Sequence, residues 1–294
     1  MANDTTAPTT ADFSGKVVVV TGAASGIGFG IADAFSAVGA QVVVADIDDA
    51  AATQAASKLS RQAGLPVRAD VTDRSDVEHL ADVAWERFGH VDVIVNNAGV
   101  FPSRMADLVH ASEEDARWVL EVNVLGVWHG ISVFGERFIQ QGTPAHIVNT
   151  GSENSVGMPH THAGFYTASK HAVLALSDVL RHELPDFVQV SILCPGFVPS
   201  NLQAAARNRP DRFGGHVDIA RREAPAGVGM PPSEVGQRVV AGVAAGDFYI
   251  FTHPPVRELV DERYGEMVAA FEARAPRFAG DQFLDTRWIS RRPR

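Results

Sequence analysis

The stretch that decides the fold is VVVVTGAASGIG at residues 17–28. Four consecutive valines predict a buried strand, because β-branched residues favour strands and continuous apolar runs are typical of strands covered on both faces. Gly22, Gly26 and Gly28 then permit a tight turn, a close approach of backbone amides to a pyrophosphate, and close packing of the next helix. That helix is expected to begin near Ile27, with its N-terminus facing the anion. The stretch predicts the phosphate-binding turn of a dinucleotide site, and an ordinary tight turn is the alternative.

Short β-branched runs and longer helical patterns alternate along the rest of the chain, as in βαβ units. Seven strands are expected, at residues 16–21, 41–45, 66–69, 91–96, 146–150, 189–194 and 248–252. Several of these runs are almost entirely apolar, which is typical of a parallel sheet covered by helices. The sequence therefore predicts an α/β fold: a single-domain Rossmann fold with a seven-stranded, parallel, doubly wound sheet and helices on both faces.

The chain is expected to have three parts. Residues 1–12 are small and polar, which predicts a mobile N-terminal arm. Residues 13–255 form the Rossmann-type domain. Within it, Pro, Gly and Arg interrupt a long break at about 200–232, which is typical of a lid or substrate loop; a surface excursion without a role is the alternative. Residues 256–294 are expected to form a C-terminal helical extension and tail. Apolar residues recur at helical spacing in 256–274 and could cover the site or join an interface.

The composition excludes several classes of protein. The chain of 294 residues carries a formal net charge of −10, which argues against a nucleic-acid partner, because phosphate binding needs clustered lysine and arginine. We see no apolar run of the roughly 20 residues that a membrane helix needs, and the first residues lack a secretory signal. The single cysteine, Cys194, agrees with a reducing compartment. We therefore expect a soluble, cytoplasmic protein with no membrane partner.

His160 and His162 have no third ligand at suitable spacing, so no metal site is expected.

An acidic residue marks the ribose end of the predicted site. Asp46 ends the second predicted strand, 24 residues after Gly22. A carboxylate at this place accepts hydrogen bonds from the two free hydroxyls of an adenine ribose and repels a 2′-phosphate. Ile47 and the glycine loop offer no lysine or arginine that would neutralise an extra phosphate. The sequence therefore predicts NAD as the cofactor; the alternative is that Asp46 merely solubilises a strand end.

A phenol and an ammonium mark the chemical end of the site. Tyr166 and Lys170 lie four residues apart in YTASK and so share one face of a predicted helix. A free tyrosine has a pKa near ~10, too high for a base at neutral pH, and a nearby ammonium is expected to lower that pKa. Tyr166 could then exchange a proton with an alcohol while hydride leaves the same carbon. Ser152 follows another strand end and could reach the same oxygen. The alternative is a solvated helix face, because this spacing alone is common.

These motifs resemble those of the short-chain dehydrogenase/reductase family, over about residues 13–252. The motifs that carry the resemblance are TGAASGIG at 21–28, Asp70-Val71, NNAG at 96–99, Asn123, Ser152, YTASK at 166–170 and PGFVPS at 195–200. The resemblance implies a catalytic tetrad. In that tetrad Tyr166 is the acid/base and Ser152 holds the substrate oxygen. Lys170 grips the nicotinamide ribose and tunes Tyr166, and Asn123 holds a relay water.

The motifs and the resemblance together imply a set of cofactor contacts, with Asp70 and Val71 at the adenine and the PGFVPS segment at the nicotinamide carboxamide. The expected contacts are Gly22, Ser25, Gly26, Ile27, Gly28, Asp46, Ile47, Asp70, Val71, Asn97, Ala98, Gly99, Tyr166, Lys170, Pro195, Gly196, Val198 and Ser200. The chain departs from the family pattern where Ser200 replaces a frequent threonine and where 251–255 reads FTHPP in place of Asp-Gly-Gly. With NLQAAARNRPDRFGG at 201–215, this ending resembles dehydrogenases of bulky aryl secondary alcohols, including those derived from lignin dimers.

The substrate side is expected to be mostly apolar and aromatic, which favours a bulky hydrophobic, aryl or cyclic substrate. The residues expected there are Phe101, Glu153, Asn154, Met158, His160, His162, Phe197 and Leu202. The sequence thus predicts NAD-dependent interconversion of a secondary alcohol and a ketone. Two alternatives stay open, a noncatalytic dinucleotide-binding sensor and an epimerase or dehydratase that uses transient oxidation. The helices expected at 113–135 and 167–182 are apolar on more than one face, which with the resemblance predicts a homotetramer or homodimer.

Overall fold

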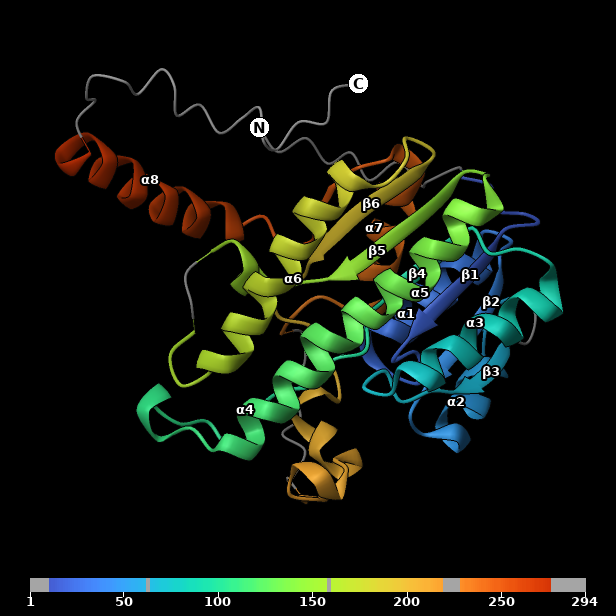
Figure 1. The fold of residues 1–294 in the computed structure, drawn as a ribbon, viewed down its shortest axis with the longest axis horizontal. Helices are drawn as coiled ribbons and strands as arrows, with labels where there is room; N and C mark the ends of the chain where they lie inside the picture. Colours follow the sequence, from blue (N-terminus) through green and yellow to red (C-terminus); the bar gives the residue numbers. More distant parts are fainter. Residues whose placement is uncertain (1–10, 62–63, 158–159, 219–227, 276–294) are drawn as a thin grey trace.

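A computed structural model describes residues 11–61, 64–157, 160–218 and 228–275. Its centre is a sheet of seven parallel strands in the order β3-β2-β1-β4-β5-β6-β7 (Figure 1). The strands are β1 (Val17–Thr21), β2 (Gln41–Asp46), β3 (Leu65–Arg68), β4 (Val93–Asn96), β5 (Ala145–Thr150), β6 (Val188–Cys194) and β7 (Tyr249–Phe251). Each boundary lies within two residues of its predicted place, and the predicted fold class is confirmed.

Helices cover both faces of this sheet, as predicted. The helices of one face are α1 (Gly26–Ala37), α2 (Asp49–Ala56) and α7 (Pro232–Ala245). The helices of the other face are α3 (Arg74–Phe88), α5 (Gly126–Gln141) and α6 (Gly164–Glu183). α4 (Glu113–Leu120) runs into α5 through a π-helical turn at Glu121–Leu125. The domain is therefore a three-layer arrangement in which both faces of every central strand are buried.

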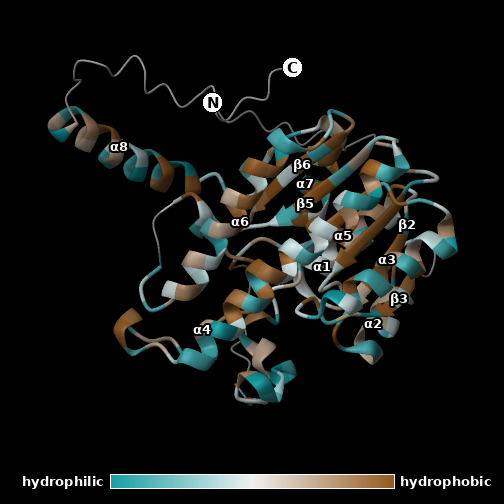
Figure 2. Ribbon diagram, viewed as in Figure 1, coloured by the Kyte–Doolittle hydropathy of each residue, from teal (hydrophilic) through white to brown (hydrophobic). Residues whose placement is uncertain are grey.

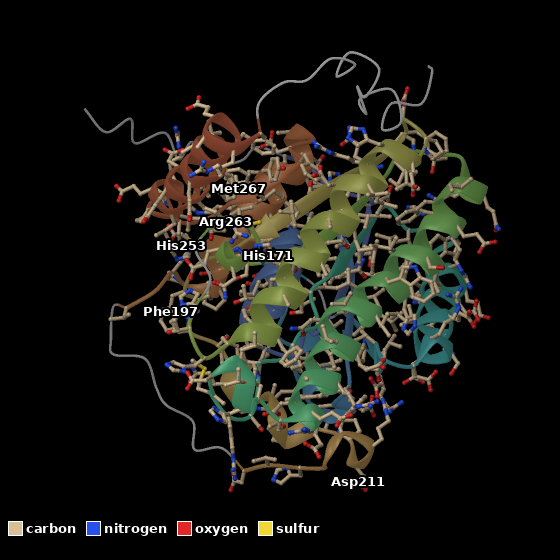
Figure 3. The ribbon with its side chains drawn as sticks, turned by 60° about the vertical axis from the view of Figure 1, so that its left-hand side comes forward. His171, Phe197, Asp211, His253, Arg263 and Met267 are labelled. Atoms are coloured by element: carbon tan, nitrogen blue, oxygen red, sulfur yellow. The ribbon has the colours of Figure 1, made fainter. Side chains whose placement is uncertain are left out.

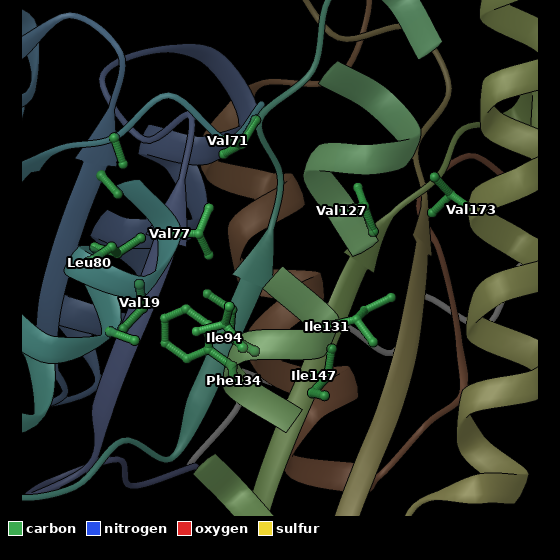
Figure 4. Packing of buried hydrophobic residues seen from close by; sticks show 14 of the residues in the cluster. Val19, Val71, Val77, Leu80, Ile94, Val127, Ile131, Phe134, Ile147 and Val173 are labelled. Atoms are coloured by element: carbon green, nitrogen blue, oxygen red, sulfur yellow. The ribbon is translucent and has the colours of Figure 1, made fainter. Parts of the chain in front are cut away.

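Two apolar layers form the core because successive side chains of a strand point to opposite faces. Val18 packs with the helices of the α1 face, whereas Val19 packs with those of the α5 face. Figure 4 shows Val19, Ile94 and Phe134 in this second layer, between the sheet and α5. Figure 2 shows mostly hydrophobic colour along the strands, whereas the helices carry both hydrophobic and hydrophilic colour. The continuous apolar runs of the sequence thus reflect burial on both faces.

One helical stretch differs from the sequence expectation about membranes. Among the described residues, Glu113–Gln141 is long and apolar enough to cross a membrane, although we expected no such stretch. More than half of its most apolar part is buried inside the fold. Ile131, Phe134 and Phe138 pack against the sheet and α3. Their burial accounts for the apolar character of the stretch as that of a core helix.

Several shorter elements surround the carboxyl end of the sheet. They are η1 (Leu108–His110), η3 (Glu153–Ser155), η4 (Leu202–Asn208), η5 (Asp211–Phe213) and the C-terminal helix α8 (Val256–Arg274). η4 and η5 lie in the predicted substrate loop, which we call the lid (residues 200–218). α8 occupies the stretch with helical spacing and extends away from the sheet in Figure 1. Most of the expected N-terminal arm and tail, and residues 219–227 of the substrate loop, lie outside the described residues.

Candidate active site

A pocket lies at the carboxyl ends of the parallel strands. Ligands of open α/β sheets bind there, where the strand order reverses, and in this sheet that point is between β1 and β4. The empty space in the pocket is about 1180 Å³, including space open to solvent. The predicted site residues that line it are Gly22, Ser25, Gly26, Ile27, Gly28, Asp46, Ile47, Asp70, Val71, Asn97, Ala98, Gly99, Tyr166, Lys170, Pro195 and Ser200. Most of the predicted cofactor contacts therefore share one cavity.

The turn between β1 and α1 has no room for side chains at two of its glycines. Gly22 has a φ of 63°, in the left-handed region, and a Cβ there would lie 2.8 Å from the Cα of Ala98. A Cβ on Gly28 would lie 2.2 Å from the carbonyl oxygen of Gly22. Glycine is thus required for the close approach of helix and strand, and the first turn of α1 faces the pocket through Ser25 and Ile27. This geometry suits a phosphate group held by backbone amides.

Asn97 fastens this turn to the end of β4. Its Nδ2 donates to the carbonyl oxygens of Thr21 and Gly22, at 2.9 and 3.3 Å. The Oγ1 of Thr21 in turn accepts from the backbone N–H groups of Asn97 and Ala98, at 3.0 and 3.1 Å. The NNAG segment therefore holds the glycine turn in position, and its small residues leave the pocket open beside it.

Asp46 stands at the end of β2 with its carboxylate held by the backbone. Its Oδ2 accepts from the N–H of Ala24 at 3.0 Å, and its Oδ1 accepts from the N–H of Asp48 at 3.2 Å. Burial raises the pKa of Asp46, and these two hydrogen bonds act in the opposite direction. The carboxylate lines the pocket with free lone pairs, so it can accept hydrogen bonds from ligand hydroxyls.

Asp70 connects the other side of the pocket to the lid. Its Oδ1 accepts from the N–H and the hydroxyl of Thr72, at 3.0 and 2.7 Å. Its Oδ2 accepts from Nη2 of Arg212, a lid residue, at 3.2 Å. Val71, next to it, lines the pocket and also packs on α5 at Gly126. The lid therefore reaches the end of the pocket that the sequence assigned to adenine.

Tyr166 and Ser152 meet in the structure. The side chain of Ser152 lies close enough to the phenol of Tyr166 to favour its ionised form, although the two residues lie on different elements. Ser152 is buried behind the pocket lining, and its Oγ accepts from the N–H of Asn154 at 3.2 Å. The ring of Tyr166 packs on Phe101, with centroids 4.8 Å apart. Burial raises the pKa of Tyr166 to about 12, the charge of Glu153 adds to this rise, and the side chain of Ser152 opposes it. The pKa of Tyr166 thus lies above its ordinary value in the chain alone, because burial outweighs the effect of Ser152, and the tuning of Tyr166 by Lys170 stays a prediction.

Lys170 lies on the same face of α6 as Tyr166, one turn further on. Its Nζ donates to the carbonyl oxygen of Thr150 at 2.9 Å and lies 5.6 Å from the centroid of the Tyr166 ring. Burial lowers the pKa of Lys170 to about 8. The side chain therefore stays mostly protonated at neutral pH and directs a positive charge into the pocket between the end of β5 and α6.

Asn123 does not line the pocket but lies fully buried behind it, in the π-helical turn before α5. Its Oδ1 accepts from the N–H of Val100 at 2.8 Å. Its Nδ2 donates to the carbonyl oxygen of Val100 at 3.0 Å and to Oγ of Ser169 at 3.1 Å. The buried amide thus finds partners in the protein itself. It ties the segment after NNAG to α6, the helix that carries Tyr166.

Two predicted cofactor contacts, Gly196 and Val198, do not line the pocket. Val198 is 8% exposed and packs in the core layer of the α1 face, while Gly196 lies against His253. The reason is the path of the chain, because the segment from Pro195 to Ser200 presents its two ends to the pocket and its middle to the protein interior. A Cβ on Gly26 would lie 3.0 Å from the Cβ of Ser200, so this segment ends beside the glycine turn.

The lid supplies five of the twelve lining residues that were not among the predicted cofactor contacts. The unpredicted lining residues are Ala69, Thr72, Val100, Trp118, Val122, Thr150, Gly151, Asn201, Ala205, Arg207, Asn208 and Pro210. The break at 200–232 predicted a loop over the site, but its composition does not tell which side chains face inward. Leu202, expected on the substrate side, also lines this cavity.

Of the residues expected on the substrate side, Phe101 and Glu153 act on Tyr166, the first by ring packing and the second by its charge. Nε2 of His160 lies 3.1 Å from Oε1 of Glu153, directly after Ser152 in the chain. Phe197 is 49% exposed and lies at the edge of the molecule in Figure 3. His162 instead pairs with Asp107 at 3.0 Å. Asn154 is buried, and Met158 lies outside the described residues.

Known proteins resemble this chain in sequence and fold over most of its length. The short chain dehydrogenase family profile matches residues 16–211. A C alpha-dehydrogenase of Sphingobium sp. is 31% identical over 270 residues, which cover 87% of this chain and 87% of that protein. A 1-deoxy-11-beta-hydroxypentalenate dehydrogenase of Streptomyces exfoliatus is 35% identical over 258 residues, 86% of this chain and 88% of that protein. The crystal structure of a short chain dehydrogenase/reductase from Burkholderia phymatum in complex with NAD is 35% identical, has a TM-score of 0.81, and covers 88% of this chain and 96% of that chain. The chain belongs to the short-chain dehydrogenase family.

Proposed function

We propose that this protein is an NAD-dependent dehydrogenase that interconverts a secondary alcohol and a ketone. The observation that carries the proposal is that Tyr166 and Lys170 line the same pocket as Asp46, with the side chain of Ser152 directly behind the phenol. Membership of a family of dehydrogenases supports this reaction class. We assign Asn123, Ser152, Tyr166 and Lys170 as the catalytic residues.

The proposed cofactor agrees with the donors and the shape of the pocket. Gly22 and Gly28 form a cradle that a Cβ would fill, next to the N-terminus of α1, as a pyrophosphate requires. Asp46 suits the two hydroxyls of an adenine ribose and disfavours a 2′-phosphate. A related enzyme was crystallised with NAD, which supports the same choice. Bound NAD supplies the nicotinamide ring that accepts the hydride, and its reduced form returns it.

The protein residues would control the proton and the orientation of the substrate. Ser152 would hold the substrate oxygen, and the phenol of Tyr166 would take the alcohol proton or return it to the ketone. In the chain alone, a tyrosine with a pKa of about 12 keeps its proton at neutral pH and is ready to act as an acid. For the oxidation of alcohol, the ammonium of Lys170 and the positive charge of the oxidised cofactor would favour the phenolate. The relay water expected at Asn123 stays a prediction.

We propose a bulky hydrophobic substrate, aryl or cyclic, on the side where Phe101 packs on Tyr166. Phe197 adds a second aromatic surface, whereas Glu153 would repel a substrate carboxylate.

A homo-oligomer is also proposed, because large apolar side chains are exposed on α6, on α5 and on the helical stretch before α5. These are Leu120, Leu125, Trp128, Ile139 and Val179. Sedimentation of the wild type and of Trp128→Glu would test the assembly.

The test of the reaction is turnover of a panel of aryl and cyclic secondary alcohols with NAD, followed by NADH absorbance. Tyr166→Phe should bind NADH, measured by fluorescence, about as well as the wild type, yet lose roughly 10²–10⁴-fold in kcat. Full activity of this variant would make Tyr166 a bystander. NADH binding by the wild type without any turnover would favour the sensor, whereas conversion of substrate without net NADH would favour an epimerase or dehydratase.

A further inference from the structure

His253 holds the backbone of a segment that ends in the pocket. It follows β7 in the FTHPP stretch, where the chain departs from the family pattern. Its Nδ1 lies 3.0 Å from the N–H of Gly196, and its Nε2 lies 3.1 Å from the carbonyl oxygen of Phe197. A carbonyl can only accept, so the ring proton is on Nε2, and Nδ1 accepts from Gly196. One neutral imidazole therefore satisfies both contacts of this single stretch of backbone. Figure 3 labels His253 and Phe197 at the same edge of the molecule, next to α8.

The segment that His253 holds connects the side of the pocket near Ser152 with the glycine turn. Pro195 lines the pocket, and its carbonyl oxygen accepts from the N–H of Glu153 at 2.8 Å, directly after Ser152. Ser200 lines the pocket at the other end of the segment, beside the glycine turn. A displacement of the middle of the segment would therefore move both of these pocket walls.

The packing around Gly196 leaves little freedom for such a displacement. A Cβ on Gly196 would lie 2.7 Å from Cγ of His253 and 3.1 Å from Oε2 of Glu153, so the glycine is held between these two side chains. The imidazole is itself anchored. The Oγ1 of Thr252, a residue that is 1% exposed, lies 2.6 Å from Nδ1, and the N–H of Val256 donates to the carbonyl oxygen of His253 at 3.1 Å.

We propose that His253 is a positioning residue for hydride transfer. It does not touch the reacting atoms. It fixes the Gly196–Phe197 backbone and thereby the positions of two pocket walls, Pro195 next to Glu153 and Ser200 beside the glycine turn, between which the cofactor would lie. The inference rests on the proposed function. A misplacement of ~1 Å between reacting groups can cost ~10²-fold in rate without abolishing binding. The loss of these two hydrogen bonds should therefore reduce kcat more than cofactor affinity.

Three substitutions separate the two contacts of the ring. His253→Phe keeps a ring and removes the hydrogen bonds to Gly196 and Phe197, together with the contact between Nδ1 and Thr252. His253→Asn places an amide oxygen where Nδ1 accepts from Gly196, and His253→Gln places an amide nitrogen where Nε2 donates to Phe197. His182→Phe, at an exposed histidine near the end of α6, is the matched control. For each variant we would measure kcat and the isotope effect with an alcohol deuterated at the carbinol carbon, the Kd of NADH by fluorescence, and the thermal midpoint.

We expect His253→Phe to lower kcat about 10- to 100-fold and to increase the isotope effect, while the Kd of NADH changes less than about threefold. His253→Asn and His253→Gln should each restore part of kcat. Wild-type kcat in the Phe variant would overturn the inference, as would a parallel loss of kcat, NADH affinity and thermal midpoint. If the Phe variant does not fold, the Asn and Gln variants decide: wild-type kcat in both would overturn it. Absence of turnover in the wild type would instead refute the proposed function.

Discussion

Arg209 and Asp115 form an ion pair that is almost completely buried, with Nη1 2.8 Å from Oδ1 and side chains 4% and 8% exposed. The same carboxylate accepts from the hydroxyl and the N–H of Ser103, in the loop after β4. The guanidinium also lies over the ring of Trp118, 5.1 Å from its centroid. The pair therefore joins the lid to α4 and to the segment after NNAG. Trp118 lines the pocket, as do Asn208 and Pro210 on either side of Arg209, so the ion pair holds the lid over the cofactor site.

Asp115→Ala should destabilise the fold by about 3–5 kcal/mol, because it leaves the guanidinium of Arg209 buried without a counter-charge. It should also weaken NADH binding, since the lid loses its anchor. Urea unfolding and NADH fluorescence would measure the two effects. The control is Arg117→Ala on the same helix, which breaks an exposed pair with Glu113 and should cost no more than about 0.5 kcal/mol. Equal unfolding curves for the two variants would contradict the prediction.

The choice of cofactor should depend on the charge at the end of β2. Asp46→Ala combined with Ile47→Arg should change the ratio of kcat/KM for NADP over NAD by about 100-fold in favour of NADP, because a repulsive carboxylate is replaced by a cation. Ile47→Arg alone keeps Asp46 and should still prefer NAD. Initial rates with both cofactors would measure the ratio. If the double variant kept the discrimination of the wild type, Asp46 would not face the ribose.

The pH dependence of alcohol oxidation should respond to the charge of Glu153, which raises the pKa of Tyr166. Glu153→Gln removes this charge, so the pKa of Tyr166 should fall and the rising limb of kcat/KM against pH should move to lower pH, by up to about one unit. Glu183→Gln, at the other end of α6, should leave the profile in place. A shift to higher pH, or the same shift in both variants, would exclude this electrostatic effect.

The glycine turn should not tolerate even a methyl group at Gly28. In Gly28→Ala, the Cβ would lie 2.2 Å from the carbonyl oxygen of Gly22 and 2.5 Å from Nδ2 of Asn97, so either the turn or the start of α1 must move. We expect NADH binding to weaken by at least about tenfold, because the phosphate-binding amides would be displaced. Gly265→Ala in α8 is the matched control: it meets nothing within 4 Å and should stabilise its helix by up to about 1 kcal/mol. Unchanged affinity in the first variant would show that the turn adapts.

Local pattern was sufficient for the elements of the fold and for most of the site. The valine run of β1 and the glycines after it depend on neighbours close in sequence, and the structure has them where they were predicted. Parallel topology then brings the ends of β1, β2, β4 and β5 to one edge of the sheet, so residues at strand ends could be assigned to one pocket.

Burial and long-range partners could be decided only by the tertiary structure. The pKa of Tyr166 rises because the fold removes water from the phenol, an effect that no spacing of residues encodes. Gly196 turns away from the pocket because it meets His253, 57 residues later, and the lid is anchored because Arg209 meets Asp115, 94 residues earlier. Periodicity reports which face of an element is buried, whereas contacts between distant segments depend on how the packed layers bring their ends together.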